Sequence, residues 1–372
     1  MKNILILNYE FPPIWWWWGV SSYDLAQCYN KNWYNVDVIT MWFKNVPKYE
    51  EYWVNIYRVN CIRKNKTVCY PFEQLTYLIS WFFKARKLIK QRHYDLCHCH
   101  FLLPTWILSL LLKKLYWLKY IISAHWSDVP WHNPDRFTFI HKFTPRIIKE
   151  IINNSDWAYA PSIYLSNLIK EKIKWINKDI TVIPNWVHIN EFVPLKKEKI
   201  ILWVWRLQPL KWLHLLAKAF SQIKDTKWYE LHICWDWPLM FELQNIQQNT
   251  NNKIILHWWM NYNLQEYKDL FWKAKIFCLP SVAESWSISL LEWMSAWCIP
   301  VWINRTVISE MIDWIWFFIK PTVESIQEQL EYLINNEIDN NIWNKARERV
   351  IQKYDKQKHS NLYLQEIKWK LS

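Results

Sequence analysis

Two cationic side chains in the second half of the sequence have the types and spacing to bind a diphosphate. Arg206 and Lys211 follow the apolar run at 199–204 and lie at the start of a helix-like segment. Arg presents a planar, bidentate fork and Lys a compact charge, so the pair could neutralise a phosphorylated ligand at the carboxyl end of a strand. A solvated basic helix start has the same spacing, and the residues alone do not decide between the two.

Two acidic side chains further along, Glu284 and Glu292, have seven residues between them. We expect Glu284 in the loop after the apolar run at 276–281 and Glu292 on the helix-like segment at 287–297. The first turn of that helix should direct free backbone N–H groups toward an anion. One carboxylate could then contact a sugar and the other a nucleotide. A carboxylate pair is also typical of hydrolysis by general acid and base, and either acid could lie on a solvated helix face.

Histidines raise two further questions. His125 ends the apolar run that begins at Tyr120, where it is either a structural hydrogen-bonding group or a side chain that faces a cleft between domains. The CHCH sequence of residues 97–100 contains zinc-binding residue types, but alternation along a strand sends Cys97 and Cys99 to one face of the sheet and the two histidines to the other. We therefore reject a zinc site, and the sequence predicts no metal and no cofactor.

Short apolar runs rich in β-branched residues alternate with longer helix-like segments, which is typical of parallel βαβ units. The expected strands are at 3–7, 36–40, 55–59, 95–100, 120–125, 158–162, 199–204, 230–234, 253–258, 276–281, 298–301 and 317–321. The polar, Pro-marked segment 184–199 separates two series of such units and is expected to be a linker.

The pattern predicts the α/β class, with two doubly wound, Rossmann-like domains that face each other across a cleft. We place the N-terminal domain at 1–195 and the C-terminal domain at 196–350. Residues 351–372 form a last helix that is expected to pack back on the first domain. Ligands of such sheets bind outside the carboxyl ends of the strands.

Composition restricts the partners and the compartment. The net charge of +13 suits nucleic acid, an anionic membrane surface or a phosphorylated substrate. The eight cysteines show no paired metal-ligand spacing and fall mostly within apolar runs, which favours a reducing, cytoplasmic location. The longest apolar stretch, 101–112, is interrupted by Pro104 and stopped by Lys113, so we expect a buried helix rather than a membrane span. Peripheral membrane contact through the basic surface stays open.

Tryptophan stands where glycine is expected. The chain has 32 Trp and one Gly among 372 residues, whereas glycine averages roughly 7% of ordinary proteins. Four tryptophans, Trp15 to Trp18, precede Gly19 in a segment where a tight loop should lead into a helix. Trp33 occupies an expected helix C′ position. Further tryptophans follow an expected strand at 235 and 237 and end another at 258 and 259. We infer that Trp replaces Gly at nearly all of the positions that once held it.

With Trp interpreted as displaced Gly, the chain resembles a GT-B fold, family-four (glycosyl transferases group 1) retaining glycosyltransferase over almost its whole length. The order and spacing of several segments carry the resemblance. They are FPP with the loop to Gly19, HWSD at 125–128, VIPNWVHINEF at 182–192, WRLQPLKW at 205–212, CWDWP at 234–238 and PSVAESWSISLLEWMSAWCIPV at 280–301. His188 stands where the family more often has Asp.

The resemblance implies that the domain at 1–195 is the acceptor side and that the domain at 196–350 binds the nucleotide sugar. It also assigns roles to the residues singled out above. It implies that Arg206 and Lys211 bind the donor diphosphate and stabilise it as it leaves, so that no metal is required. It places Glu284 on hydroxyls of the transferred sugar and Glu292 on the ribose, with main chain from Ser287 and Ile288 nearby.

The same resemblance places His125 near the reacting centre and the loop to Gly19 against the donor. The implied reaction is transfer of a hexose from a nucleotide sugar to a hydroxyl of a carbohydrate or lipid-linked acceptor, with retention at the anomeric carbon and mainly by positioning and charge stabilisation.

Two alternative functions would account for parts of the sequence. A GT-B epimerase or phosphorylase would share the fold but need other signature residues. A single-strand nucleic-acid binder could use positive charge and aromatic stacking, yet the tryptophans mark turns and caps rather than one basic groove, so we expect no nucleic-acid partner.

A residue with a Cβ in a left-handed position costs about 1–2 kcal/mol, against a total stability of about 5–15 kcal/mol. We therefore expect the chain to be loosely packed and its activity impaired.

Overall fold

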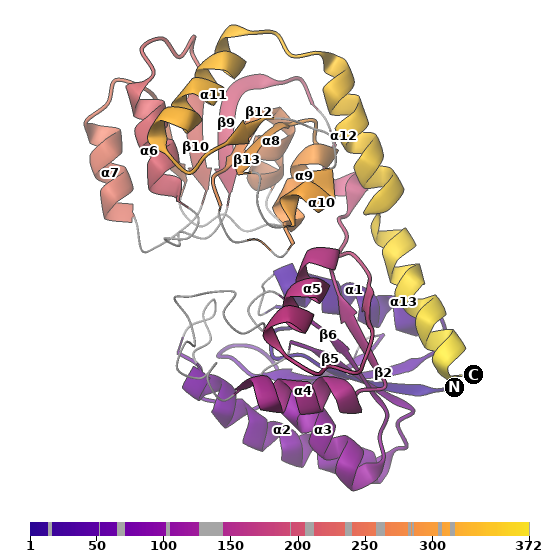
Figure 1. The fold of residues 1–372 in the computed structure, drawn as a ribbon. Helices are drawn as coiled ribbons and strands as arrows, with labels where there is room; N and C mark the ends of the chain where they lie inside the picture. The colour runs from indigo at the N-terminus through magenta and orange to yellow at the C-terminus, as the bar shows by residue number, and fades with distance from the viewer. Residues whose placement is uncertain are drawn as a thin grey trace. The chain divides into compact units, whose positions relative to one another are not determined.

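The chain forms two α/β units in the computed structural model, which describes residues 1–13, 17–51, 53–64, 71–101, 105–125, 144–193, 195–204, 212–234, 240–257, 265–281, 284, 286–303, 307–312 and 317–371. The N-terminal unit consists of Met1–Asn185 together with Gln357–Ser372, and the C-terminal unit consists of Trp186–Lys356 (Figure 1). The last sixteen residues of the chain thus belong with the first domain.

An eight-stranded sheet forms the centre of the N-terminal unit, in the order β3-β4-β2-β1-β5-β6-β7-β8. All neighbouring strands are parallel except β3 and β4. The strands are β1 (Asn3–Leu7), β2 (Asn35–Met41), β3 (Tyr49–Glu51), β4 (Asn55–Val59), β5 (Leu96–His100), β6 (Tyr120–Ser123), β7 (Trp157–Ala160) and β8 (Ile180–Val182).

Helices cover both faces of this sheet (Figure 1). They are α1 (Trp17–Lys31), α2 (Pro71–Gln91), α3 (Thr105–Tyr116), α4 (Thr144–Asn154), α5 (Ile163–Lys172) and α13 (Lys356–Leu371). The face that carries Leu5, Cys97 and Tyr120 packs against α2, α3 and α4. The opposite face carries His98, which contacts Tyr29 of α1 and Tyr363 of α13.

The C-terminal unit has a six-stranded parallel sheet in the order β11-β10-β9-β12-β13-β14. The strands are β9 (Glu198–Val204), β10 (Glu230–Cys234), β11 (Ile254–His257), β12 (Ala274–Leu279), β13 (Ile299–Ile303) and β14 (Phe318–Ile319). Its helices are the 3-10 helix η3 (Ile189–Glu191) and α6 (Leu213–Gln222), α7 (Met240–Gln248), α8 (Gln265–Lys273), α9 (Ile288–Ser295), α10 (Ile308–Ile312), α11 (Val323–Asn335) and α12 (Asn340–Lys353).

These two Rossmann-like sheets confirm the predicted α/β class with doubly wound topology. In each unit the strand order reverses beside the first strand of the series, between β1 and β5 in one sheet and between β9 and β12 in the other. The carboxyl ends of the strands at such a reversal are where α/β sheets bind ligands. The segments that follow these four strands are therefore the first places to look for a site.

Tryptophan occupies most of the described left-handed backbone positions. Among the described residues, nine non-glycine residues have positive φ, and six of them are Trp33, Trp117, Trp175, Trp212, Trp228 and Trp297. Trp33 has φ 67° and lies at the C′ position expected from the sequence: its N–H donates to Asn30 O and the next N–H, of Tyr34, donates to Tyr29 O. That pair of bonds is the Schellman motif, in which glycine is preferred. The pattern supports the inference that Trp stands at glycine positions.

The indoles differ in how they are accommodated. Trp33, Trp117, Trp175 and Trp228 are exposed, so at these positions the cost is that of the left-handed backbone alone and the indole is not packed into the interior. Other indoles bury an N–H group that lacks a hydrogen-bond acceptor among the described residues. The eight tryptophans with such an Nε1 atom are Trp81, Trp106, Trp203, Trp286, Trp293, Trp297, Trp302 and Trp343. An unsatisfied buried donor costs about 1–3 kcal/mol.

Candidate functional site

The C-terminal unit places its candidate residues after β12, one of the two strands at the reversal of the sheet. Ser287 is the N-cap of α9, and its Oγ accepts a hydrogen bond from Leu290 N at 3.3 Å. Ile288 is the first residue of the helix. Glu284 lies between β12 and α9 and is buried. This short segment brings three of the predicted donor-site residues to the N-terminus of one helix, where free N–H groups favour an anionic ligand.

Glu292 lies one helical turn beyond Ile288 and is fully buried. Neither of its carboxylate oxygens has a hydrogen-bond partner among the described residues. Burial, and to a lesser extent the nearby charge of Glu191, raise the pKa of Glu292 well above its ordinary value. A buried carboxyl group without donors is costly in the absence of a ligand. Both oxygens therefore keep unused acceptor capacity with respect to the described residues.

The cations of the predicted site follow the other strand at the reversal. β9 ends at Val204, and the next described residue is Trp212, the N-cap of α6. Arg206 and Lys211 therefore lie outside the described residues. The parallel pairing of β9 with β12 puts the carboxyl ends of both strands at the same edge of the sheet.

In the N-terminal unit a chain of histidines ends at His125. His100, the last residue of β5, and His125, just beyond β6, have stacked rings with centroids 5.6 Å apart, and His100 Nδ1 lies 3.3 Å from His125 Nε2. His98 stacks on His100 with centroids 4.4 Å apart. Its ring nitrogens bond to Tyr29 Oη at 2.9 Å and to Ser123 Oγ at 2.8 Å. The three imidazoles thus lie on one face of the sheet, near the carboxyl ends of β5 and β6.

These imidazoles stay uncharged at neutral pH. Burial lowers the pKa of His100 to about 3. Burial and then the neighbouring His100 lower the pKa of His125 well below its ordinary value. A hydrogen bond between two neutral imidazoles requires one ring to donate and the other to accept, so the tautomer of His100 fixes that of His125. His125 can then serve as a neutral hydrogen-bonding group, and His100 as the residue that positions it.

The sequence predicted only some of the contacts among these histidines. The alternation predicted for residues 97–100 is confirmed, since the sulfur atoms of Cys97 and Cys99 lie 3.5 Å apart while the two histidines stack on each other. The contact of His100 with His125 was missed, because it depends on β5 lying beside β6. Among the residues described here, no group of three or more His, Cys, Asp or Glu side chains could hold a metal ion.

Gly19 lies in the first turn of α1, and its carbonyl accepts from Ser22 Oγ at 3.1 Å. The expected loop therefore ends earlier than the sequence suggested, because the helix already begins at Trp17. Trp17 and Trp18 have helical backbone, so neither position requires the positive φ that favours glycine. Trp15 and Trp16 lie outside the described residues.

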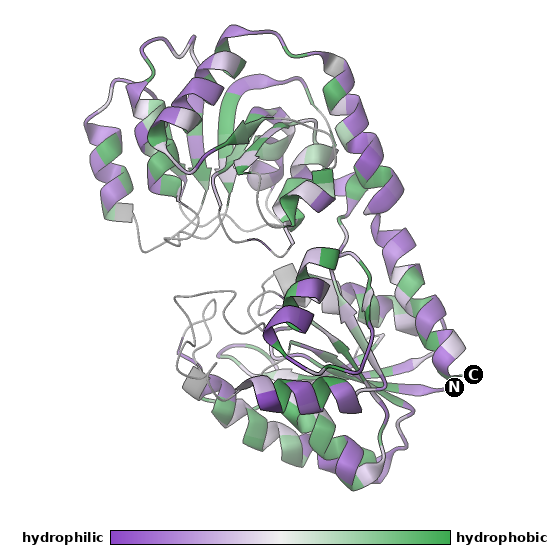
Figure 2. Ribbon diagram, viewed as in Figure 1, coloured by the Kyte–Doolittle hydropathy of each residue, from purple (hydrophilic) through white to green (hydrophobic). Residues whose placement is uncertain are grey.

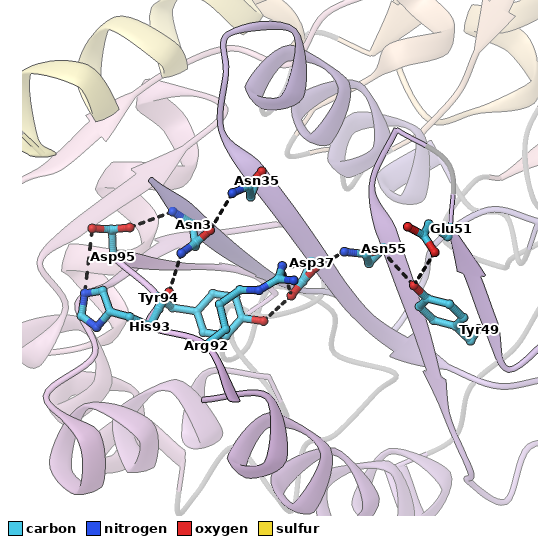
Figure 3. Close-up of polar contacts among 10 residues, drawn as sticks. All are labelled: Asn3, Asn35, Asp37, Tyr49, Glu51, Asn55, Arg92, His93, Tyr94 and Asp95. Atoms are coloured by element: carbon cyan, nitrogen blue, oxygen red, sulfur yellow. Dashed lines mark hydrogen bonds and ion pairs between the residues drawn. The ribbon is translucent and has the colours of Figure 1, made fainter. Parts of the chain in front are cut away.

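A polar cluster at the opposite edge of the N-terminal sheet is structural (Figure 3). Asp37 of β2 is buried and accepts from Asn55 Nδ2 at 2.7 Å, from Arg92 Nη1 at 3.2 Å and from the hydroxyl of Tyr94. Asp95 accepts from the backbone N–H of Asn3. These residues lie toward the amino ends of β1, β2, β4 and β5, away from the edge where ligands bind. They tie strands together and do not extend the site.

Two family models match the chain. Residues 19–191 match the model described as Glycosyltransferase Family 4, and residues 186–355 match the model described as Glycosyl transferases group 1. The two matches overlap at residues 186–191 and follow the division into N-terminal and C-terminal halves. A comparison with curated protein sequences finds no match.

Solved structures share the whole fold at low sequence identity. A sucrose-phosphate synthase from Thermosynechococcus elongatus superposes with a TM-score of 0.83 at 14% identity, over 99% of each chain. A glycosyltransferase from Rickettsia africae gives a TM-score of 0.73 at 17% identity, over 100% of this chain and 99% of the other. The Anabaena protein HepE, in complex with UDP and glucose, gives 0.76 at 13% identity, over 99% of this chain and 100% of the other. Both halves of the chain therefore have the arrangement found in these proteins.

Proposed function

Because the chain belongs to the GT-B glycosyltransferases, with a family 4 N-terminal half and a group 1 C-terminal half, and so to enzymes of glycosyl transfer, we propose that it moves a hexose from a nucleoside-diphosphate sugar to an acceptor hydroxyl. The proposal includes retention of the anomeric configuration. It assigns the donor to the C-terminal unit and a carbohydrate or lipid-linked acceptor to the N-terminal unit, and it requires neither a metal nor a nucleic-acid partner. We place the enzyme in the cytoplasm.

The observation that carries the proposal is the carboxyl group of Glu292, which is buried on the helix that Ser287 caps and has no hydrogen-bond partner among the described residues. A ribose offers two adjacent hydroxyl donors to such a carboxylate, and the helix start offers N–H groups to the attached phosphates. Known structures support this choice of ligand. HepE from Anabaena has been solved with UDP-glucose, and starch synthase IV from Arabidopsis thaliana with ADP and acarbose.

The remaining assignments follow from the chemistry of the transfer. Arg206 and Lys211 would stabilise the negative charge that develops on the diphosphate as the bond from the anomeric carbon to the phosphate oxygen breaks. Glu284 would hold hydroxyls of the transferred sugar. The new bond forms from the acceptor oxygen to the anomeric carbon on the same face, while the acceptor proton moves to the leaving phosphate. His125, kept neutral by burial, would orient the sugar near the reacting centre, with His100 positioning its ring.

We also propose that the tryptophans impair the chain as it stands. Six of them occupy left-handed backbone positions, and eight bury an indole N–H without a described acceptor. A glycine-restored chain serves as the reference for activity. In it, Gly replaces Trp15 to Trp18, the six tryptophans with positive φ and the tryptophans of the motifs that carry the resemblance.

The test is calorimetric titration of the glycine-restored chain with UDP, GDP and ADP and with their glucose conjugates, in the presence of EDTA. We expect at least one nucleotide to bind, and its sugar conjugate to be consumed when acceptors are added. Glu292→Ala should weaken nucleotide binding, whereas Glu324→Ala, which removes an exposed acid from α11, should leave it unchanged. Binding that ignores Glu292 would contradict the proposed donor site. Binding that requires a divalent metal would contradict metal independence.

A further inference from the structure

An exposed apolar stripe runs along α2 of the N-terminal unit. Leu75, Ile79 and Phe83 recur every fourth residue and are 57%, 65% and 62% exposed. The opposite side of the same helix is buried through Tyr77, Trp81 and Ala85, among others. Large apolar side chains at this spacing form a continuous strip on one face of a helix. The strip therefore lies on the surface of the folded unit, while the opposite side of α2 packs into the hydrophobic core of the N-terminal unit.

The neighbouring helix α3 widens the strip. Leu111 and Leu115 are 42% and 56% exposed, although the sequence led us to expect a buried helix here. An open groove of about 280 Å³ lies between the two helices and is lined by Leu78, Ile79, Phe82, Phe83, Ile107, Leu108 and Leu111. Figure 2 shows the hydrophobic segments that run along α2 and α3. Contiguous apolar surface of this kind marks an interaction site more often than an accident of packing.

Basic residues accompany the apolar strip on both helices. Together α2 and α3 contain six of them: Lys84, Arg86, Lys87, Lys90, Lys113 and Lys114. Arg86, Lys87, Lys90 and Lys114 are exposed. The two helices contain one acid, Glu73, which is buried and accepts from the backbone N–H of Lys64. The surface thus combines apolar side chains with positive charge and presents no exposed acid from either helix.

We infer that this surface, formed by Leu75, Ile79, Phe83, Leu111 and Leu115 with the basic residues of α2 and α3, docks on an anionic lipid bilayer. Apolar side chains of amphipathic helices insert at the boundary between headgroups and acyl chains, while Lys and Arg bind the anionic headgroups. The proposed contact is one of a helix surface with the bilayer interface. No described helix is long and apolar enough to cross a membrane. The inference depends only on the N-terminal unit and does not rest on the proposed transfer reaction.

Charge argues for lipid over a second copy of the chain. A symmetric dimer through this face would bring the same basic residues of both copies together, because a two-fold interface pairs a patch with itself. Like charges brought together in a largely apolar interface are destabilising. An anionic bilayer instead supplies the charge that the surface lacks.

The test is co-sedimentation of the full chain with vesicles of phosphatidylcholine, alone or mixed with phosphatidylglycerol. We expect binding to the mixed vesicles and little to the neutral ones. The double variant Ile79→Asp/Phe83→Asp should bind the mixed vesicles at least about tenfold more weakly than the parent, because it replaces two inserting side chains with acids. Its matched control is Ile163→Asp/Phe241→Asp, which changes the same residue types at positions that are 56% and 84% exposed on other helices, and it should bind as the parent does.

The electrostatic half of the inference has its own pair of variants. Arg86→Glu/Lys87→Glu/Lys90→Glu should weaken binding by about 10²-fold, since each basic residue near an anionic surface contributes about a factor of five. Lys31→Glu/Lys174→Glu/Lys224→Glu makes the same change in net charge at other exposed positions and should have a small effect. Raising the salt concentration from about 0.1 to about 1 M should weaken binding of the parent, because the Debye length falls from about 10 to about 3 Å.

Hydrogen exchange of the unchanged chain provides a measurement that no variant can compromise. Vesicles should slow exchange in residues 75–90 and 111–115 and leave α7 of the C-terminal unit unaffected. The inference is overturned if mixed vesicles do not bind, if both members of a matched pair bind alike, or if protection falls elsewhere. It is also overturned if light scattering shows a dimer that Ile79→Asp/Phe83→Asp dissociates, since the apolar strip would then be an interface between copies.

Discussion

His100 Nδ1 lies 3.3 Å from His125 Nε2, with the two rings stacked at an interplanar angle of 11°. Both imidazoles are buried, and burial is the largest cause of the lowered pKa of each. The contact therefore links the histidine assigned to the reacting centre to a second histidine that strand pairing holds in place.

This arrangement predicts a loss of stability in acid. A histidine with a lowered pKa in the folded state contributes stability above its unfolded pKa of about 6.5, and that stability is lost as the pH falls toward the folded value, which for His100 is about 3. At pH 5 the loss from His100 alone is about 2 kcal/mol. We expect the urea midpoint to fall between pH 7 and pH 5, and His100→Gln to remove part of that fall. His93→Gln, at an exposed histidine, is the control. An unchanged pH dependence in His100→Gln would contradict the buried, neutral assignment.

His100→Gln should also separate positioning from folding. If His100 fixes the tautomer of His125, the variant in the glycine-restored chain should lower kcat more than it raises KM for the donor sugar. A purely structural role would change the melting temperature and leave both kinetic constants of the folded fraction as they were.

Glu292 predicts that nucleotide binding releases a proton. Burial raises the pKa of its carboxyl group above the ordinary value of 4.5 in the ligand-free protein, while ribose hydroxyls that donate to it favour the ionised form and lower the pKa on binding. Affinity should therefore rise with pH above 4.5, by at most about tenfold per pH unit. Calorimetry in buffers of different ionisation enthalpy measures the proton directly. Glu292→Gln should abolish the release, whereas Glu324→Gln should keep it. Equal proton release in both variants would assign it to another group.

The left-handed tryptophans predict that glycine stabilises the chain at specific positions. Replacing Trp33, Trp117, Trp175, Trp212, Trp228 and Trp297 by Gly should each add about 1–2 kcal/mol to the free energy of unfolding, because a Cβ no longer occupies a left-handed position. The parent chain should show a weak near-UV circular dichroism signal and a broad urea transition, and the sixfold variant a sharper one. Trp369→Gly is the matched control: Trp369 is exposed on α13, and Gly should destabilise that helix by about 1 kcal/mol. A sharp two-state melt of the parent would refute the expected impairment.

The cations that follow β9 carry the next prediction. In the glycine-restored chain, Arg206→Ala or Lys211→Ala should lower donor-dependent turnover by about 10²-fold or more, in line with the loss of a preorganised charge contact. Glu284→Ala should abolish most of the activity. Lys224→Ala, at an exposed lysine after α6, should change little. Turnover that survives both cation variants would mean that these residues are only surface charge.

The sequence predicted the interior of the N-terminal sheet better than its edges. Long apolar runs such as those of β1 and β9 announce buried parallel strands, whereas β3 and β8 contain three residues each, lie at the two edges of their sheet and were missed. Contacts between strands were equally hidden, because His100 meets His125 only through the pairing of β5 with β6. The lack of a described partner for Glu292 was not predictable either, since hydrogen-bond satisfaction depends on the packing of α9. Residue type and motif spacing nevertheless sufficed to single out both His125 and Glu292.

The segment that follows β1 carries the last prediction. It leads to Gly19 at the reversal of the N-terminal sheet, where ligands of α/β folds approach the backbone. Trp17 and Trp18 are helical, so at these two positions we expect bulk rather than backbone conformation to be the obstacle, since an indole presents on the order of 200 Å² of surface. We expect a chain restored to glycine everywhere except Trp15 to Trp18 to melt within a few degrees of the fully restored chain, yet neither to bind nor to transfer a nucleotide sugar. Calorimetry on this pair makes the comparison, with Trp33 retained alone as the control that should still bind. Measurable donor binding with all four tryptophans in place would show that this segment is not part of the donor site.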